Sequence, residues 1–120
     1  MGVASAGYSI VQASERQLTV DGGMEVVDDY HGVISSEVYD SVQPRITSTS
    51  VEDGRGWWRR GQSGNLNISE YVDYQGEGHA SCENGNGTFD NGDWEPAYTW
   101  STSSVGWTVL GGNKAYYNYR

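Results

Sequence analysis

The chain has 120 residues, 36% of them hydrophobic, and a net charge of −9 at neutral pH. This length suits one small domain, whose core is close to the lower limit for a stable fold. With only seven lysines and arginines, nucleic acid and anionic lipid surfaces are unfavourable partners, because both reward positive charge. No apolar run approaches the roughly 18 residues that a membrane-spanning helix needs.

Charge and aromatic residues divide the sequence in two. Residues 1–53 carry nine acidic and two basic residues, a net charge of −7, whereas residues 54–120 carry seven and five, a net charge of −2. The second part also holds all five tryptophans and six of the nine tyrosines. We therefore predict an acidic, strand-rich N-terminal segment (1–53) and an aromatic-rich β-domain (54–120), whose rings form either its core or a binding face.

Strand signals recur in the first part, and no stretch of the chain shows the apolar period of an amphipathic helix. Residues 17–20 and 24–27 flank Asp21-Gly22-Gly23, which predicts a hairpin with a tight turn. Residues 33–42 and 45–51 alternate around a Gln-Pro pair and predict two further strands.

The second part predicts five more strands around a turn-rich loop at residues 82–93. Trp107 and Val109 alternate with Tyr117 and Tyr119 across a Gly-Gly-Asn turn, which indicates an antiparallel hairpin with these four side chains facing inward. Many short strands without a helix indicate a sandwich or barrel. We expect an all-β fold, a small antiparallel β-sandwich with an ordered strand-rich N-terminal extension. The strands expected in this part are 56–60, 67–74, 97–102, 106–110 and 114–119.

His79 and Cys82 are the residue types of a nucleophilic pair, in which the imidazole would activate the thiol. Positions three apart on a strand point to opposite faces, so the two side chains cannot meet without a turn. We expect Cys82 to be a small buried or partly exposed thiol instead. Since it is the single cysteine, neither an intrachain disulfide nor a cysteine-based zinc site can form within the chain.

Oxygen-bearing side chains gather in residues 84–95, with a composition similar to that of a calcium-binding loop. Their spacing does not match an EF-hand, and turn chemistry explains Asn-Gly and Asp-Asn-Gly sequences. Nothing in the sequence marks two of its sixteen carboxylates as an acid-base pair. We therefore predict no metal site, no cofactor, no catalytic residue and a function that is not enzymatic.

The densest cationic and aromatic feature of this acidic chain is Trp57, Trp58, Arg59 and Arg60. Alternation along a strand places one tryptophan in the core and the other at the surface, where an arginine can stack on it. An exposed tryptophan beside arginines suits sugar rings and pyrophosphate. The alternative interpretation is an edge strand whose tryptophan covers a small core.

Five short motifs follow one another in the second part of the chain: Gly54–Gly61, Glu70–Tyr74, His79–Ser81, Gly92–Ala97 and Gly112–Tyr117. In this order and spacing they resemble the lactococcin 972 family of secreted bacteriocins over residues 54–120. The resemblance implies a small β-sandwich that is exported by a signal peptide and acts on related Gram-positive bacteria through lipid II and septum formation. It brings no catalytic residues, which fits a binding protein.

Two functional hypotheses follow. The first is a secreted antibacterial protein that binds a cell-wall precursor or another envelope component through Trp57, Trp58, Arg59 and Arg60. The second is a structural or interaction module that forms homo-oligomers through exposed strand edges, with residues 1–53 pairing to a neighbour. Ala4-Ser5-Ala6 has the small-residue pattern that ends a signal peptide, although a flexible N-terminus explains it equally well.

Overall fold

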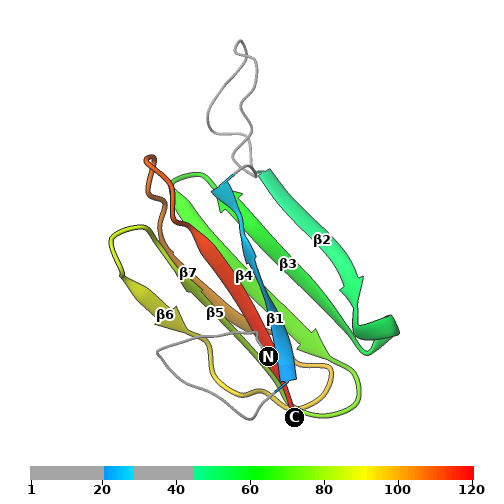
Figure 1. Ribbon diagram of the computed structural model, residues 1–120. Coiled ribbons are helices and arrows are strands. Elements are labelled where there is room, and N and C mark those ends of the chain that lie inside the picture. Colours follow the sequence, from blue (N-terminus) through cyan, green and yellow to red (C-terminus); the bar gives the residue numbers. More distant parts are fainter. Residues whose placement is uncertain (1–20, 29–44) are drawn as a thin grey trace.

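The computed structural model describes residues 21–28 and 45–120, which form two antiparallel four-stranded sheets packed face to face (Figure 1). The predicted small antiparallel β-sandwich is confirmed. The described residues include a 3-10 turn, η3 (Glu52–Gly54), and no helix among them is long and apolar enough to cross a membrane. The strands are β1 (Asp21–Val26), β2 (Arg45–Val51), β3 (Gly56–Ser63), β4 (Leu66–Asp73), β5 (Gly78–Glu83), β6 (Phe89–Asn91), β7 (Ser101–Gly106) and β8 (Lys114–Tyr119).

The strand-rich N-terminal part contributes one edge strand to each sheet. The first sheet has the order β1-β8-β5-β6 and the second the order β2-β3-β4-β7. β1 pairs with β8, almost a hundred positions away, and β2 pairs with β3. The described portions of residues 1–53 therefore pair within the chain and complete both sheets.

The apolar core is small and mostly aromatic. Tyr117 lies at its centre, with its ring centroid 4.7 Å from that of Trp58 and 4.8 Å from that of Tyr71. Ala80 and Ala115 are fully buried beside these rings. The small alanines leave room between the sheets for the large rings, so a few aromatic side chains supply much of the buried apolar area. The predicted inward position of Tyr117 is confirmed.

Polar side chains of β4 tie the two sheets together across the interior. Asn67 is fully buried and donates its amide hydrogens to the carbonyl oxygens of Glu83 (2.9 Å) and Lys114 (3.1 Å). Ser69 donates to the carbonyl oxygen of Tyr116 at 2.8 Å and accepts the indole hydrogen of Trp58 at 2.9 Å. Because buried polar groups are costly unless hydrogen-bonded, these contacts fix how the sheets lie on one another.

The predicted hairpin between residues 107–110 and 114–119 is wrong. β7 ends at Gly106, and the chain then turns through Trp107–Asn113 to enter β8 in the other sheet. Val109, predicted to face inward, is 88% exposed, whereas Trp107 and Tyr119 are half-buried against the core. The Gly-Gly-Asn sequence does form a turn, but the turn joins two sheets rather than two paired strands.

Asp21-Gly22-Gly23 is also not a turn, because all three residues pair with β8. A Cβ atom on Gly22 would lie 1.9 Å from the carbonyl oxygen of Tyr117. The glycine is therefore needed because two strands approach closely at this point. In a sequence, a glycine required for close approach looks the same as a glycine required for a turn. The expected strands at 17–20 and 33–42 lie outside the described residues.

Two further boundaries differ from expectation. Residues 97–102 were expected as a strand, but pairing begins only at Ser101. The expected loop at 82–93 contains the end of β5 and the short β6, which pair with each other. Five turn-forming residues separate β5 from β6, and these strands are too short for their alternation of side chains to be recognised in the sequence.

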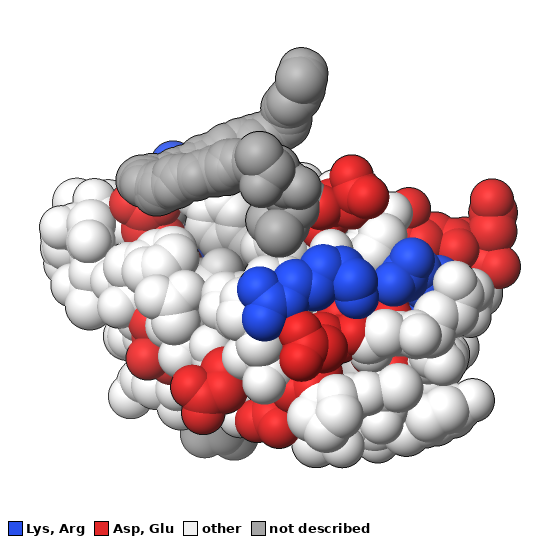
Figure 2. All heavy atoms as spheres, turned by 90° about the horizontal axis from the view of Figure 1, so that it is seen from below, with Lys and Arg blue, Asp and Glu red and all other residues white. Residues whose placement is uncertain are grey.

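The two ends of the sandwich differ in charge. We call the end formed by residues 52–55, 73–78 and 92–100 the charged end, because it holds six acidic residues and one arginine, with Arg120 beside them. Figure 2 looks onto this end and shows a band of basic side chains with acidic side chains on either side. At the opposite end, the loops 63–66, 84–88 and 106–113 contain no charged residue, and Asp28, which follows β1, lies against the last of them. We call these three loops the uncharged end.

Candidate functional site

Alternation along β3 separates the four predicted binding residues into two pairs. Trp58 and Arg60 point between the sheets and are 2% and 5% exposed. Trp57 and Arg59 are on the outer face of the β2-β3-β4-β7 sheet and are half-buried. Only this second pair can contact a ligand without opening the fold, so the binding role stays a prediction for Trp57 and Arg59.

Arg60 has the contacts of a structural residue. Its guanidinium donates two hydrogen bonds to the carboxylate of Glu25 on β1, at 3.0 and 3.1 Å. It also donates to the hydroxyl of Thr49 (2.7 Å) and the carbonyl oxygen of Trp58 (3.0 Å). The group lies 4.3 Å from the centroid of the Trp58 ring. Bidentate pairing and stacking together fix Arg60 in place and link β1 to the opposite sheet.

The outer face next to Trp57 carries a row of polar side chains across all four strands of the sheet. Trp57 donates its indole hydrogen to the hydroxyl of Ser48 at 2.7 Å, which holds the ring along the sheet surface. Arg59 forms an ion pair with Glu70 directly opposite on β4, and Glu70 is in turn opposite Thr102 on β7. This row presents hydrogen-bond donors and acceptors next to one flat aromatic ring.

An open groove of about 330 Å³ runs along this face beside the row. Leu66 and Ile68 are its apolar residues, and Asp90 reaches it from β6 and accepts a hydrogen bond from the backbone of Ser104 at 2.9 Å. Polar groups make up most of its lining, which suits a hydrophilic ligand. It is lined by Leu66, Ile68, Glu70, Asp90, Thr102, Ser103 and Ser104.

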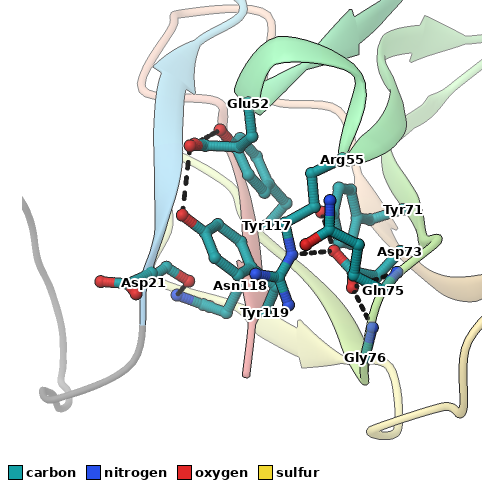
Figure 3. A network of polar contacts seen from close by, with 10 residues as sticks. All are labelled: Asp21, Glu52, Arg55, Tyr71, Asp73, Gln75, Gly76, Tyr117, Asn118 and Tyr119. Carbon is teal, nitrogen blue, oxygen red and sulfur yellow. Dashed lines mark hydrogen bonds and ion pairs between the residues drawn. The ribbon is translucent and has the colours of Figure 1, made fainter.

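A network of charged and phenolic groups closes the charged end of the sandwich (Figure 3). Glu52 accepts hydrogen bonds from the hydroxyls of Tyr117 and of Tyr119, the latter at 3.1 Å. Arg55 stacks over the ring of Tyr119, 4.0 Å from its centroid. Burial and the neighbouring Glu52 carboxylate raise the pKa of Tyr119 to about 12, so both tyrosines remain protonated donors at neutral pH. These hydrogen bonds hold η3 against β8.

Asp73 is the fully buried acceptor at the centre of this end. Its carboxylate accepts from Arg55 (2.9 Å), the hydroxyl of Tyr71 (2.6 Å), and the backbone amides of Gly76 (2.6 Å) and Gln75 (3.2 Å). Burial alone would raise the pKa of Asp73, but these hydrogen bonds outweigh it and lower the pKa. With every oxygen occupied by the protein itself, the network stabilises the fold and leaves no acceptor for a substrate.

His79 and Cys82 point to opposite faces of β5, as the strand alternation predicts. Cys82 is fully buried, and burial raises the pKa of its thiol to about 12. His79 packs against Trp94, with 5.0 Å between ring centroids, and burial together with the charge of Arg120 lowers the pKa of its imidazole. A protonated interior thiol and a distant neutral imidazole do not make a nucleophilic pair.

Asn84 organises the oxygen-rich loop as a turn. Its side-chain oxygen accepts hydrogen bonds from the backbone amides of Asn86 (2.9 Å) and Thr88 (3.0 Å), and its amide donates to the carbonyl of Gly106 (3.0 Å). This is the turn chemistry expected from the sequence. In the part of the chain that the structure describes, no three His, Cys, Asp or Glu side chains gather as a metal site would require.

Comparison of the chain with protein-family models, with curated proteins and with solved structures finds no match. The resemblance to the lactococcin 972 family thus depends on the sequence motifs alone. Sequence reading did not single out Glu70, Asp90 or Thr102 as groove residues. The Gly64-Asn65 turn between β3 and β4 was the available signal for Glu70, because a hairpin closed there places it opposite Arg59.

Proposed function

We propose that the protein is a secreted antibacterial binding protein that recognises a sugar-containing component of the Gram-positive cell envelope, with the sugar part of lipid II as the candidate ligand. Secretion and the antibacterial target come from the motifs that resemble the lactococcin 972 family. The observation that carries the binding role is the groove over β4 and β7 on the outer face of the β2-β3-β4-β7 sheet, the face that also bears Trp57.

The chemistry of the groove favours a sugar over a phosphate. Glu70 and Asp90 accept hydrogen bonds from hydroxyl groups, and carboxylate acceptors make the stronger class of hydrogen bond. The same two carboxylates repel a phosphate, and the positive charge of Arg59 is already paired with Glu70. Trp57 adds an aromatic face with an apolar body, onto which the C–H side of a pyranose ring can pack.

The test is binding of the purified full chain to cell-wall sacculi and to a soluble lipid II head-group analogue. Trp57→Ala removes the ring, and Glu70→Gln keeps its shape but removes its charge. Phe89→Ala is the matched control, because Phe89 is an exposed aromatic residue whose ring packs against Tyr116 within the β1-β8-β5-β6 sheet and does not line the groove. We expect Trp57→Ala and Glu70→Gln each to weaken binding at least tenfold, and the control to bind like the wild type. The urea midpoint of each variant shows whether it is folded.

Two outcomes contradict the proposal. If folded Trp57→Ala and Glu70→Gln bind as tightly as the wild type, the groove is not the site. If the wild type binds neither sacculi nor the analogue, and does not inhibit growth or alter septa of Gram-positive indicator strains, the function itself is wrong.

An interaction module is the second candidate, and one observation favours it. β2 is an edge strand of seven residues rich in serine and threonine, with no proline or lysine to block a further strand. Self-association through this edge would appear in sedimentation velocity as species whose size grows with protein concentration. A monomer at all concentrations up to the millimolar range removes this candidate.

A further inference from the structure

The turn between β7 and β8 exposes two aliphatic side chains almost completely. Val109 is 88% and Leu110 98% exposed, more than any other large apolar residue in the described part of the chain. The turn projects beyond the strands at the upper left of Figure 1. Single exposed aliphatic residues are common on protein surfaces, but two adjacent ones at a projecting tip form a contiguous apolar feature.

This turn is held in one conformation by hydrogen bonds to Asn113, Asp28 and Gly85. Fully buried Asn113 accepts from the backbone amide of Thr108 at 2.9 Å and donates to its carbonyl oxygen at 2.8 Å. Asp28 accepts from the backbone amides of Gly112 (3.0 Å) and Asn113 (2.9 Å), while Gly85 donates to the Thr108 hydroxyl at 3.0 Å. A tip fixed in advance loses little conformational freedom on binding, so its contacts are used efficiently.

The surroundings of the tip are also unusual for this chain. The net charge is −9, yet the three loops of the uncharged end contain no charged residue of their own. Their polar groups are amides, hydroxyls and backbone, with many glycines. The carboxylate of Asp28, which lies beside the turn, keeps its hydrogen bonds to Gly112 and Asn113 when the loops leave water, so the desolvation penalty is reduced. The charged end, seen in Figure 2, faces the opposite direction.

We propose that the uncharged end docks on the surface of a lipid bilayer, with Val109 and Leu110 inserted at the boundary between headgroups and acyl chains. A convex tip matches a fluid interface, which needs no preformed pocket, whereas a protein partner would have to provide one. Binding depends on apolar burial and not on charge, so an electrically neutral surface is the preferred one. This inference uses different residues from the sugar groove and does not depend on it.

The structure also limits how deep and how strong the insertion is. The turn is closed by one backbone hydrogen bond, from Gly111 to Thr108 at 3.0 Å, and it includes polar groups that need water or headgroup partners. Insertion therefore stops at the interface. Two aliphatic side chains bury less apolar area than a single acyl chain, whose membrane binding is itself marginal and reversible. The expected binding is weak and half-saturates only at high lipid concentration.

Co-sedimentation of the full chain with phosphatidylcholine vesicles tests the proposal. We expect measurable binding that changes little between low and high salt, and at least tenfold weaker binding after Val109→Ser combined with Leu110→Ser. Tyr98→Ser is the matched control, because Tyr98 is a 73% exposed aromatic residue at the charged end. Vesicles that contain phosphatidylglycerol should bind less at low salt, because the protein is acidic, and should approach the neutral vesicles at high salt.

Failure of the wild type to sediment with either kind of vesicle overturns the proposal, and so does equal binding by the wild type and the folded double serine variant. Trp57→Ala separates this inference from the proposed function. It should bind vesicles like the wild type while losing affinity for the sugar ligand.

Discussion

Replacing Asp73 with alanine should destabilise the protein more than any surface change, because Asp73 is the buried acceptor of four hydrogen bonds. Removing one partner of a buried ion pair costs about 3–5 kcal/mol. The side chain of Arg55 is 22% exposed and can regain some water, whereas the buried hydroxyl of Tyr71 then lacks its acceptor. We therefore expect a loss of about 4 kcal/mol, a large share of the roughly 5–15 kcal/mol by which proteins of this kind are stable.

Urea unfolding followed by tryptophan fluorescence measures this loss. At an m-value of about 1.5 kcal/mol per molar urea, the midpoint falls by about 2–3 M. Tyr71→Phe should cost only about 1 kcal/mol, because Asp73 keeps its other donors. Glu77→Ala, at the exposed pair with Arg120, should cost less than about 1 kcal/mol.

The acid limb, the part of the stability-against-pH curve in which the free energy of unfolding falls at low pH, provides an independent test of the role of Asp73. The folded pKa of Asp73 is lowered from 3.8, so its contribution is present above that value and is lost as pH falls through the folded pKa. Asp73→Ala should flatten the acid limb. A loss of less than about 1 kcal/mol, with an unchanged acid limb, would refute the central role of this network.

Two further predictions concern the faces of β3 and the pH dependence of stability. Arg60→Met should lower the free energy of unfolding by about 2–4 kcal/mol, because it removes a buried, bidentate partner of Glu25. Arg59→Met should lower it by less than about 1 kcal/mol. Equal urea midpoints for the two variants would contradict the assignment of Arg60 to the inner face of β3 and Arg59 to the outer face. His79 has a folded pKa below 6.5, so the unfolded chain takes up its proton first, and stability should fall as pH drops below about 6.5. His79→Gln should remove that part of the pH dependence, which urea midpoints at pH 7.5 and 5.5 measure, and an unchanged difference between the two midpoints would show that His79 is not its source.

The strands that sequence reading placed well are those whose alternation is long enough to be unambiguous. Arg45–Val51 and Lys114–Tyr119 match β2 and β8 at both ends. The pairing of these strands was less accessible, since β8 pairs with β1 and β5 rather than with its neighbour in sequence. Local patterns specify a strand and its faces, whereas the choice of partner depends on how the whole chain covers its core.

The candidate site shows the same limit from another direction. Alternation correctly divides Trp57 from Trp58, but it does not say which of the two faces inward. The inner face is set by the hydroxyl of Ser69, which accepts the indole hydrogen of Trp58, and by Tyr117, which packs on its ring. Asp90 reaches the groove from a strand of the other sheet, so no spacing within one strand predicts it.

Strand alternation also separates the structural residues of β3 from the proposed binding residues. Trp58 and Arg60 contact β8 and β1 and so hold the first sheet to the second. Trp57 and Arg59, which alternate with them along β3, lie on the outer surface. The exposed tip at Val109 and Leu110 likewise depends on buried Asn113, which itself makes no contact with solvent. Because the structural roles belong to Trp58, Arg60 and Asn113, we expect substitutions of the surface residues Trp57, Val109 and Leu110 to change binding with little effect on folding. A variant series that failed to separate the two would show that these surfaces are parts of the core.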